Sequence, residues 1–346
     1  MNLSASRPTV QNVPEPSRTG KALVDASRAF AKENPAQSWW YLLSTLSLLI
    51  GSVAVAAHGS LGLIAWVASF VTGLLIVRMF ILYHDFMHGA ILRSSPLARV
   101  ILYTYGLLAM TPPRVWRDTH DYHHAHTSKI VGSHIGSFAM VTTAMWQKMS
   151  TPERLYYRII RHPLTILFGY FTIFMYGMCI HSFLRSPHKN WDSAASLLLN
   201  WSLTWFLITQ YSFLTFLCCY GLPMFVATAI GAYLFYAQHN FPSISIQPRE
   251  HWLYTKAALE SSSYMKMNLV MSWFTGNIGY HHVHHLNPRI PFYRLPEAMN
   301  SIPELQNPCV TGLSLSDIIA CFKLKVWDPD LKRMVSYREA SSSILS

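Results

Sequence analysis

Three groups of histidines in this chain have the spacing of metal ligands. They are His84-Asp-Phe-Met-His88, His120-Asp-Tyr-His123-His124 and His281-His-Val-His284-His285. The last two share the pattern H-x-x-H-H, which 17 histidines in 346 residues would produce by chance only about 0.04 times. On a helix, residues three and four apart share a face, so each group directs two or three imidazoles to one side.

Nine imidazoles are too many for one tetrahedral zinc, which takes four ligands, and they suit two metals with open positions. Nitrogen ligands favour iron, copper, zinc or nickel over calcium and magnesium. Two of the nine follow apolar runs: His84 and His239 each lie just past a predicted membrane span. The three histidine groups and His239 can therefore meet at one depth, at the membrane face. The predicted ligands are His84, His88, His120, His123, His124, His239, His281, His284 and His285.

The remaining histidines are not predicted to be ligands. His282 lies in the third group, but on a helix it points about 100° away from the ligand face. Single histidines are usually hydrogen-bonded or interfacial residues, which we expect of His58, His162, His181 and His188. Three others are expected at the surface or beside the ligands: His126, His134 and His251.

Long uncharged stretches predict the helices that must position these side chains. A membrane-spanning helix needs about 20 apolar residues. The stretch 194–238 has no charged residue for 45 positions, which is enough for two spans with a break near Gly221-Leu222-Pro223. The sequence predicts an all-α integral membrane protein with four transmembrane helices, at 38–58, 61–83, 195–218 and 222–238.

The distribution of Lys and Arg sets the predicted orientation. The turns at 59–60 and 219–221 have neither, whereas 114–162 and the chain after 239 are rich in both. By the positive-inside rule, both termini and all histidine groups face the cytoplasm. The runs 97–112 and 163–183 are then half-embedded helices, and a cytoplasmic helical cap holds a two-metal site. A six-span alternative would place some histidine groups on opposite sides of the membrane.

Composition excludes several classes of protein. Charged residues are 12% of the chain and hydrophobic residues 51%, whereas a soluble domain has about 25% charged residues. No cleavable signal peptide precedes the apolar runs. Because no nucleic-acid-binding motif is present, the net charge of +11 indicates orientation and attraction to anionic lipid, and we predict no nucleic-acid partner. No CxxC pair occurs among the five cysteines, which predicts neither a disulfide framework nor a cysteine zinc site.

The histidine groups and their flanking residues resemble the membrane fatty acid desaturases, which carry three histidine boxes. The stretch from Thr275-Gly-Asn-Ile-Gly-Tyr through His281 to Leu295 is similar to the third box of the acyl-lipid Δ12/ω3 branch. His84–Gly89 and Thr119–Thr127 resemble the first and second boxes. The resemblance covers residues 38–300, which we take as the desaturase domain, between a cytoplasmic tail at 1–37 and a cytoplasmic C-terminal segment at 301–346.

The resemblance implies a di-iron centre held by the nine histidines named above. It also implies that O₂ and two electrons from an external donor are used to introduce a cis double bond into a lipid-linked acyl chain. One position departs from the pattern of the similar acyl-CoA desaturases: Phe235 stands where they place an asparagine, four residues before His239. Water or Asn277 would complete the second metal. The first box has Phe86-Met87 where many Δ12/ω3 members have Cys-Gly.

Three aspartates are placed to accept the second ring N–H of ligand histidines: Asp85, Asp118 and Asp121. The acyl chain would lie in an apolar tunnel for which Trp252, Tyr264 and Trp273 are candidate lining residues, with core packing as the alternative. No haem, flavin or iron–sulfur motif is visible, so electrons would come from ferredoxin or a cytochrome b5-like protein, whose acidity suits the basic face. No transit peptide or endoplasmic-reticulum retention signal is present, so we expect a bacterial inner membrane.

Other functions fit part of the same pattern. A carotenoid ketolase or hydroxylase and an alkane hydroxylase would share the boxes, but the residues around the third box favour acyl lipids. A membrane zinc hydrolase would need neither O₂ nor electrons. A metal transporter would place histidines within the spans rather than at their ends.

Overall fold

Three helices in the described part of the chain are long and apolar enough to cross a membrane. The computed structural model describes residues 17–58, 62–130 and 135–342. The three candidates are α2 (Pro35–Ala57), α3 (Leu63–Met87) and the continuous run Phe213–Ala237. That run consists of α11 (Phe213–Phe216), a π-helical turn η4 (Leu217–Gly221) and α12 (Leu222–Ala237). Asn34 caps α2 by accepting the Gln37 N–H, and Pro35 occupies the first helical position, so α2 begins three residues earlier than predicted.

The predicted break near Gly221-Leu222-Pro223 is wrong. The helix α10 (Trp191–Gln210) ends earlier, at Tyr211-Ser212, and the chain is helical from Phe213 to Ala237. Pro223 is accommodated because it lies at the start of α12, directly after the π-helical turn, where the regular hydrogen-bond ladder is already shifted. The 20-residue helix α10 is more polar than the other three. Its Asn200 is buried and donates to the carbonyl of Leu107.

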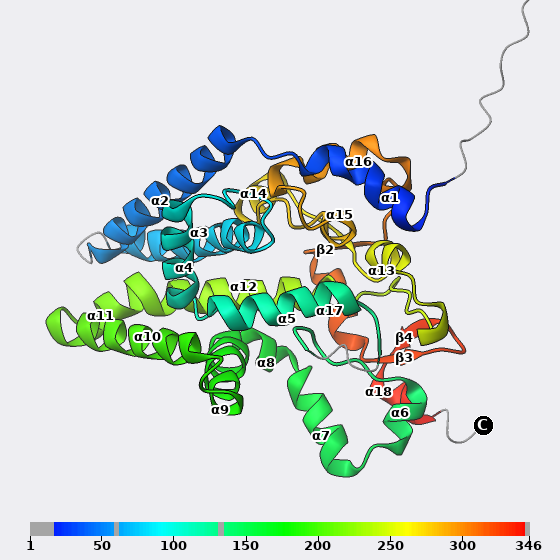
Figure 1. The fold of residues 1–346 in the computed structure, drawn as a ribbon. Helices are drawn as coiled ribbons and strands as arrows, with labels where there is room; N and C mark the ends of the chain where they lie inside the picture. The colour runs from blue at the N-terminus through cyan, green and yellow to red at the C-terminus, as the bar shows by residue number, and fades with distance from the viewer. Residues whose placement is uncertain (1–16, 59–61, 131–134, 343–346) are drawn as a thin grey trace, which may run out of the picture.

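The outer surface of these helices is apolar, as expected of helices that face lipid. Large side chains stand exposed along α2, α3 and α10–α11, among them Trp40, Leu63, Trp205 and Phe213 at 63–78% exposure. Figure 1 shows these helices running side by side on one side of the molecule. Hydrophobic surface on this scale marks a contact surface, and the length and composition of the helices fit contact with a membrane.

The two short apolar runs form helices as predicted. The first is α4 (Pro96–Leu108), which begins at the Ser95 cap and crosses the direction of α3 in Figure 1. The second comprises α8 (Pro163–Leu167), a long π-helical segment η3 (Tyr170–His181) and α9 (Ser182–Arg185). The π-helical segment carries exposed Phe171 and Tyr176, and its Gly169 end packs against α12, where a Cβ would lie 3.0 Å from Ala232.

The remaining described residues form a cap at one end of these helices (Figure 1). Its elements are α1 (Gly20–Ser27), η1 (Arg28–Ala31), α5 (Pro113–His126), α6 (Thr143–Lys148), α7 (Thr151–Ile160), η5 (Arg249–His251), α13 (Tyr254–Glu260), α14 (Leu269–Phe274), α15 (His281–Leu286), η6 (Phe292–Arg294), α16 (Leu295–Ser301), η7 (Pro303–Leu305), α17 (Leu315–Lys323) and α18 (Tyr337–Ser342).

The cap is not entirely helical, which corrects the all-α prediction. β1 (Tyr264–Lys266) pairs in parallel with β2 (Val310–Gly312), and β3 (Val326–Asp328) pairs antiparallel with β4 (Arg333–Val335). Each strand has three residues, too short for an alternating pattern to be recognised in the sequence. The first pair joins the third-box region to the C-terminal segment.

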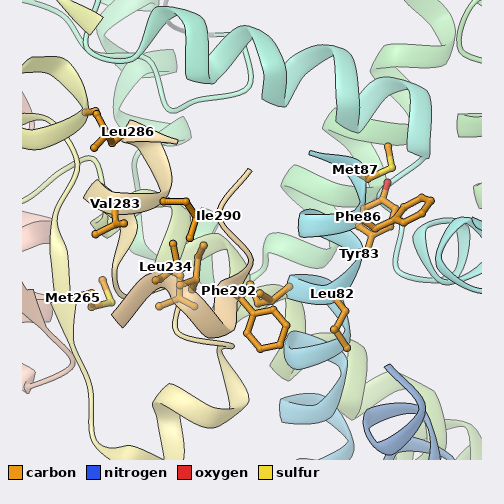
Figure 2. Packing of buried hydrophobic residues seen from close by; sticks show 14 of the residues in the cluster. Leu82, Tyr83, Phe86, Met87, Leu234, Met265, Val283, Leu286, Ile290 and Phe292 are labelled. Carbon is orange, nitrogen blue, oxygen red and sulfur yellow. The ribbon is translucent and has the colours of Figure 1, made fainter. Parts of the chain in front are cut away.

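The main core lies where the end of α3 meets α12 and the chain around α15. Figure 2 shows Leu82 and Phe86 of α3, Leu234 of α12 and the side chains of Val283 and Phe292 in this cluster. All five are at most 6% exposed. The core therefore packs directly beside the histidine boxes and fixes the position of α15 relative to α3.

A buried arginine within α3 ties the span to the cap. Arg78 is 3% exposed, donates to Thr45 of α2 and to the carbonyl of Trp273, and places its guanidinium 4.0 Å from the centre of the Trp273 ring. Trp273 therefore packs against a cation at this position.

Candidate metal centre

Four segments bring the predicted ligands to one place. The helix α3 extends to Met87, four residues beyond the predicted end of the span, so His84 belongs to its last turns and His88 caps it. α5 carries the second box and α15 the third. His239 follows the end of α12, where its backbone N–H still bonds to the carbonyl of Tyr236.

The nine imidazoles form two groups, each able to hold a metal ion. Within each group, the nearest ring nitrogens all lie within 4.8 Å of one another. The first group consists of His84, His88, His120, His124 and His284, and the second of His123, His239, His281 and His285.

Each H-x-x-H-H box contributes to both groups, in opposite ways. In the second box, the i and i+4 residues His120 and His124 join the first group and the i+3 residue His123 joins the second. In the third box, His281 and His285 join the second group and His284 the first. On a helix the i and i+4 side chains lie about 40° apart, whereas i+3 lies about 100° from i+4. One short helix can therefore serve two centres.

The ring nitrogens converge at distances that suit ligands of one ion. In the first group, consecutive Nε2 atoms of His84, His120, His124 and His284 are 3.1, 3.2 and 3.0 Å apart. In the second group, those of His123, His239, His281 and His285 are 3.0, 2.8 and 3.1 Å apart. Two nitrogens each about 2.0–2.1 Å from one metal ion are separated by about 3 Å. The donor set and its spacing therefore fit a metal ion in each group.

The outward ring nitrogens of several of these histidines are oriented by polar partners. Asp85 Oδ1 lies 3.0 Å from Nδ1 of His84, and the Ser261 carbonyl lies 2.9 Å from Nδ1 of His239. Thr127 Oγ1 lies 3.2 Å from Nδ1 of His285. These contacts direct Nε2 of each ring towards its group, as outer partners do for metal-bound histidines.

Burial holds the imidazoles neutral. In α5, burial and the neighbouring histidines lower the pKa of His120, His123 and His124 well below the usual range. The same causes act on the pKa of His281, His284 and His285 in α15. A neutral imidazole has a free lone pair, which is the form that binds a metal.

Two of the aspartates and Asn277 lie elsewhere than predicted. Asp118 forms a salt bridge with Lys189 at 2.7 Å and faces no histidine of the two groups. Asp121 is 60% exposed, and its carboxylate is 3.9 Å from Nδ1 of His88, beyond hydrogen-bond distance. Asn277 donates its side-chain amide to the carbonyl of Phe292, so it stabilises the segment after the third box instead of completing the second group.

The other histidines lie outside the two groups wherever the structure describes them. His282 Nε2 faces the carbonyl of Leu305 at 3.2 Å, in the direction predicted for it. His126 stacks on Tyr122, and His134 is outside the described residues. Phe235 places its ring 5.1 Å from that of His123 and offers no ligand atom.

A small cavity of about 30 Å³ adjoins the second group, between His123, His239, Phe138 and Ser261. One water molecule needs about 10–15 Å³ of such space, so this cavity suits water or O₂ rather than an acyl chain. Neither Trp252, which donates to the Thr127 carbonyl, nor Tyr264, which packs on Tyr280, lines it.

Three supports of the site were not predicted from the sequence. Trp116 stacks on His120 with the ring centres 4.3 Å apart, and Thr127 and the Ser261 carbonyl face ring nitrogens as described above. Trp116 and Thr127 occur at i−4 and i+7 from His120 on one helical face, a signal that could have identified them. The carbonyl of Ser261 comes from a distant segment and leaves no such signal.

Three helices long and apolar enough to span a membrane, together with nine converging imidazoles in two groups that could each hold a metal ion, define a membrane-type protein with a candidate two-metal centre. The fatty acid desaturase family model matches residues 60–308, and the chain belongs to that family. It is similar to a fatty acid desaturase of Bacillus subtilis, with 29% identity over 328 residues that cover 92% of this chain and 91% of the relative. It is also similar to an sn-1 acyl-lipid omega-3 desaturase (ferredoxin) of Nostoc, with 25% identity covering 78% and 76% of the two chains. The chain is therefore a desaturase-type oxidoreductase.

Proposed function

We propose that this protein is an O₂-dependent fatty acyl desaturase that introduces a cis double bond into a lipid-linked acyl chain at a di-iron centre. The observation that carries the proposal is the pair of buried histidine groups, one of five imidazoles and one of four. Neutral nitrogen ligands with room for further ligands suit iron that must also bind a co-substrate. The acyl-lipid substrate is supported by the relatives named omega-3 acyl-lipid desaturases.

The first iron would be held by His84, His88, His120, His124 and His284, and the second by His123, His239, His281 and His285. When bound, the irons supply the oxidising power that an unactivated C–H bond requires. The balance is one O₂, two electrons and two protons taken up, two hydrogens removed from adjacent carbons, and two waters released. The protein's residues hold the ring nitrogens, exclude bulk water and position the acyl chain.

The electron donor would be an external acidic carrier such as ferredoxin or a cytochrome b5-like protein. The support is the net charge of +11 and the word ferredoxin in the names of two relatives. A basic surface accelerates encounter with an acidic carrier.

The protein would cross the membrane four times, with α10 as the fourth span beside the three strongly apolar helices. Both termini and the cap would face the cytoplasm, in a bacterial inner membrane. Residues 1–37 would form a cytoplasmic tail, 38–300 the desaturase domain and 301–346 a cytoplasmic segment. Loop charge supports this orientation.

The proposal is tested by the fatty-acid profile of a bacterial host that expresses the protein with ferredoxin and its reductase. Gas chromatography–mass spectrometry should detect new unsaturated chains with the intact protein and none with His124→Ala. Purified protein that contains zinc instead of iron, with no new unsaturated chain, would favour a hydrolase and contradict the proposal. Iron without acyl products would direct attention to carotenoids and alkanes.

A further inference from the structure

A hollow of about 370 Å³ opens beside the first histidine group, and arginines surround it. The end of α3 with the loop that follows it, the start of α4, the middle of α5 and the segment after α15 form its walls. Four guanidinium groups from these four segments line it: Arg93, Arg99, Arg117 and Arg289. The remaining walls include Tyr103 and His88.

These cations have no carboxylate partner within the hollow. Among its described lining residues there is no Asp or Glu, and none of the four arginines forms a salt bridge to a described carboxylate. Asp121, one turn from Arg117 on α5, is near enough for Arg117 to lower its pKa electrostatically, but it is 60% exposed and outside the hollow. Four converging positive charges repel one another unless an anion lies between them.

One of the arginines is held in place by its neighbours, and a second packs its stem beside a glycine. Arg117 donates to the Tyr103 hydroxyl at 2.9 Å and contacts the Met87 sulfur at 3.6 Å. Gly89 has φ +69°, and a Cβ there would lie 3.0 Å from Cδ of Arg93, so the glycine leaves room for the stem of Arg93. A guanidinium group that is preorganised, as that of Arg117 is, loses less side-chain entropy when it binds an anion.

The hollow lies at the level where lipid-facing surface ends. On α4, Leu97 and Val100 are 60% and 64% exposed on either side of Arg99. An arginine between exposed apolar residues, on a short apolar helix that crosses the direction of α3, has the position of a membrane–water interface residue (Figure 1). A ligand bound here can reach the hollow from the bilayer surface.

We propose that the hollow is a subsite for the phosphate group of a phosphoglycerolipid whose acyl chain is desaturated. Phosphate is the anion that several planar guanidinium groups bind through paired hydrogen bonds, and lipid phosphates lie at this depth. The subsite would select phosphate-bearing lipids over neutral diacylglycerols and glycolipids. This inference rests on the proposed function, since it assigns the class of lipid that carries the acyl chain.

The test compares two lipids with identical chains, dipalmitoylphosphatidylglycerol and dipalmitoylglycerol, bound to the purified full-length protein in neutral detergent. The intact protein should bind the phosphatidyl lipid more tightly. The Arg99→Gln/Arg289→Gln variant should lose about tenfold of that affinity and keep its affinity for dipalmitoylglycerol, because only the phosphate contacts are removed. Arg99→Lys/Arg289→Lys should lie between them. Arg114→Gln, one turn from Arg117 but outside the hollow, should match the intact protein.

Three outcomes would overturn the subsite. Equal binding of the two lipids by the intact protein is one, and equal loss of both lipids in the glutamine variant is another, since that would indicate a structural role. The third is that millimolar inorganic phosphate binds to the intact protein, and not to the glutamine variant, while both lipids bind to both proteins alike. The site would then take free phosphate.

The desaturation assay separates this inference from the proposed function. New double bonds without a preference for the phosphatidyl lipid would leave the function standing and remove the subsite. A preference for binding the phosphatidyl lipid without any new double bond would leave the subsite standing and contradict the proposed function.

Discussion

The carboxylate of Asp85 joins the first histidine group to the segment that follows the third box. Its Oδ2 accepts a hydrogen bond from the backbone N–H of Phe292 at 2.7 Å, while Oδ1 lies 3.0 Å from Nδ1 of His84. The residue is 1% exposed. One side chain therefore orients a predicted ligand and fixes a segment 207 positions away in the sequence.

Asp85→Asn should lower the metal affinity of the first group and the desaturase activity by about 10- to 100-fold, the usual effect of losing a partner of a metal-binding histidine, and leave the metal of the second group in place. The amide keeps the volume but loses the charge, and it can present an N–H to His84 instead of an oxygen. Metal analysis of the purified protein and the fatty-acid profile measure both effects. Asp118→Asn is the control, because that aspartate pairs with Lys189. Equal effects of the two substitutions would contradict the role given to Asp85.

The two histidine groups should respond separately to substitution. His284→Ala removes a nitrogen 3.0 Å from that of His124 in the first group, and His285→Ala removes one 3.1 Å from that of His281 in the second. Each variant should retain about half of the iron and lose activity, since each group would hold one ion. His126→Ala, whose ring stacks on Tyr122, should retain both metal and activity. A His126→Ala variant without metal would show that the groups are wrongly drawn.

Gly279→Ala should destabilise the protein by roughly 1–3 kcal/mol, because its backbone lies against β1. A Cβ at this position would be 2.4 Å from the carbonyl oxygen of Met265, and Met265 donates its N–H to the Gly279 carbonyl at 2.8 Å. Gly231→Ala is the matched control, since its Cβ would meet only Phe174 at 3.9 Å. Thermal unfolding in detergent compares the two. A Gly279→Ala protein as stable as Gly231→Ala would rule out this close approach.

Stability should rise with pH between about 7 and 10.5 because of Lys325. Burial, with Arg161 nearby, lowers the pKa of this amine to about 7, below its ordinary value of 10.5. In that interval the unfolded chain binds a proton that the folded chain does not, so raising the pH removes a term that favours unfolding. Lys325 Nζ donates to the Arg161 carbonyl at 2.6 Å and to the Tyr236 hydroxyl at 3.2 Å. The melting temperature of the intact protein should be higher at pH 9.5 than at pH 7, and this difference should be smaller for Lys325→Met. An equal difference in both proteins would show that another group titrates.

The turn at Tyr211-Ser212 should lie outside the cell if the four-span topology is correct. In a cysteine-free background, Ser212→Cys should react with a membrane-impermeant maleimide added to intact cells. Ser342→Cys, which lies near the C-terminus in α18, should react only after the cells are opened. Both serines are exposed, so accessibility does not differ between them for other reasons. The reverse labelling pattern would contradict the proposed orientation.

The recurrence of histidine at helical spacing predicted a clustering that the structure contains, because ligand convergence depends on local periodicity and on the depth at which apolar runs end. The division into two groups could not be predicted in the same way. It depends on how α5 and α15 are rotated relative to each other, and rotation is set by packing of residues such as Val283 and Phe292 that carry no pairing signal.

The features that were mispredicted are those in which local signals compete with tertiary contacts. Gly221 and Pro223 predict a turn, yet the π-helical turn that ends at Gly221 continues directly into α12. Asp118 precedes the second histidine box by only two residues on α5, so its side chain projects from nearly the opposite side of the helix to His120, where it forms a salt bridge with Lys189. β1 depends on a partner strand more than 40 residues away, as in the pairing of Tyr264 with Val310, whereas β3 and β4 are close in sequence but only three residues long.

The 25 residues of α3 form one helix about 37 Å long, and its first 21 steps carry the chain about 31 Å from Leu63 to His84. The hydrocarbon layer of a bilayer is about 30 Å thick. The helix α3 therefore fixes the distance between the far membrane surface and the histidines at about one hydrocarbon thickness. A thinner bilayer would lift the centre away from the acyl chains and a thicker one would draw it among them, so hydrophobic mismatch along this single helix would couple access to substrate with the thickness of the surrounding lipid.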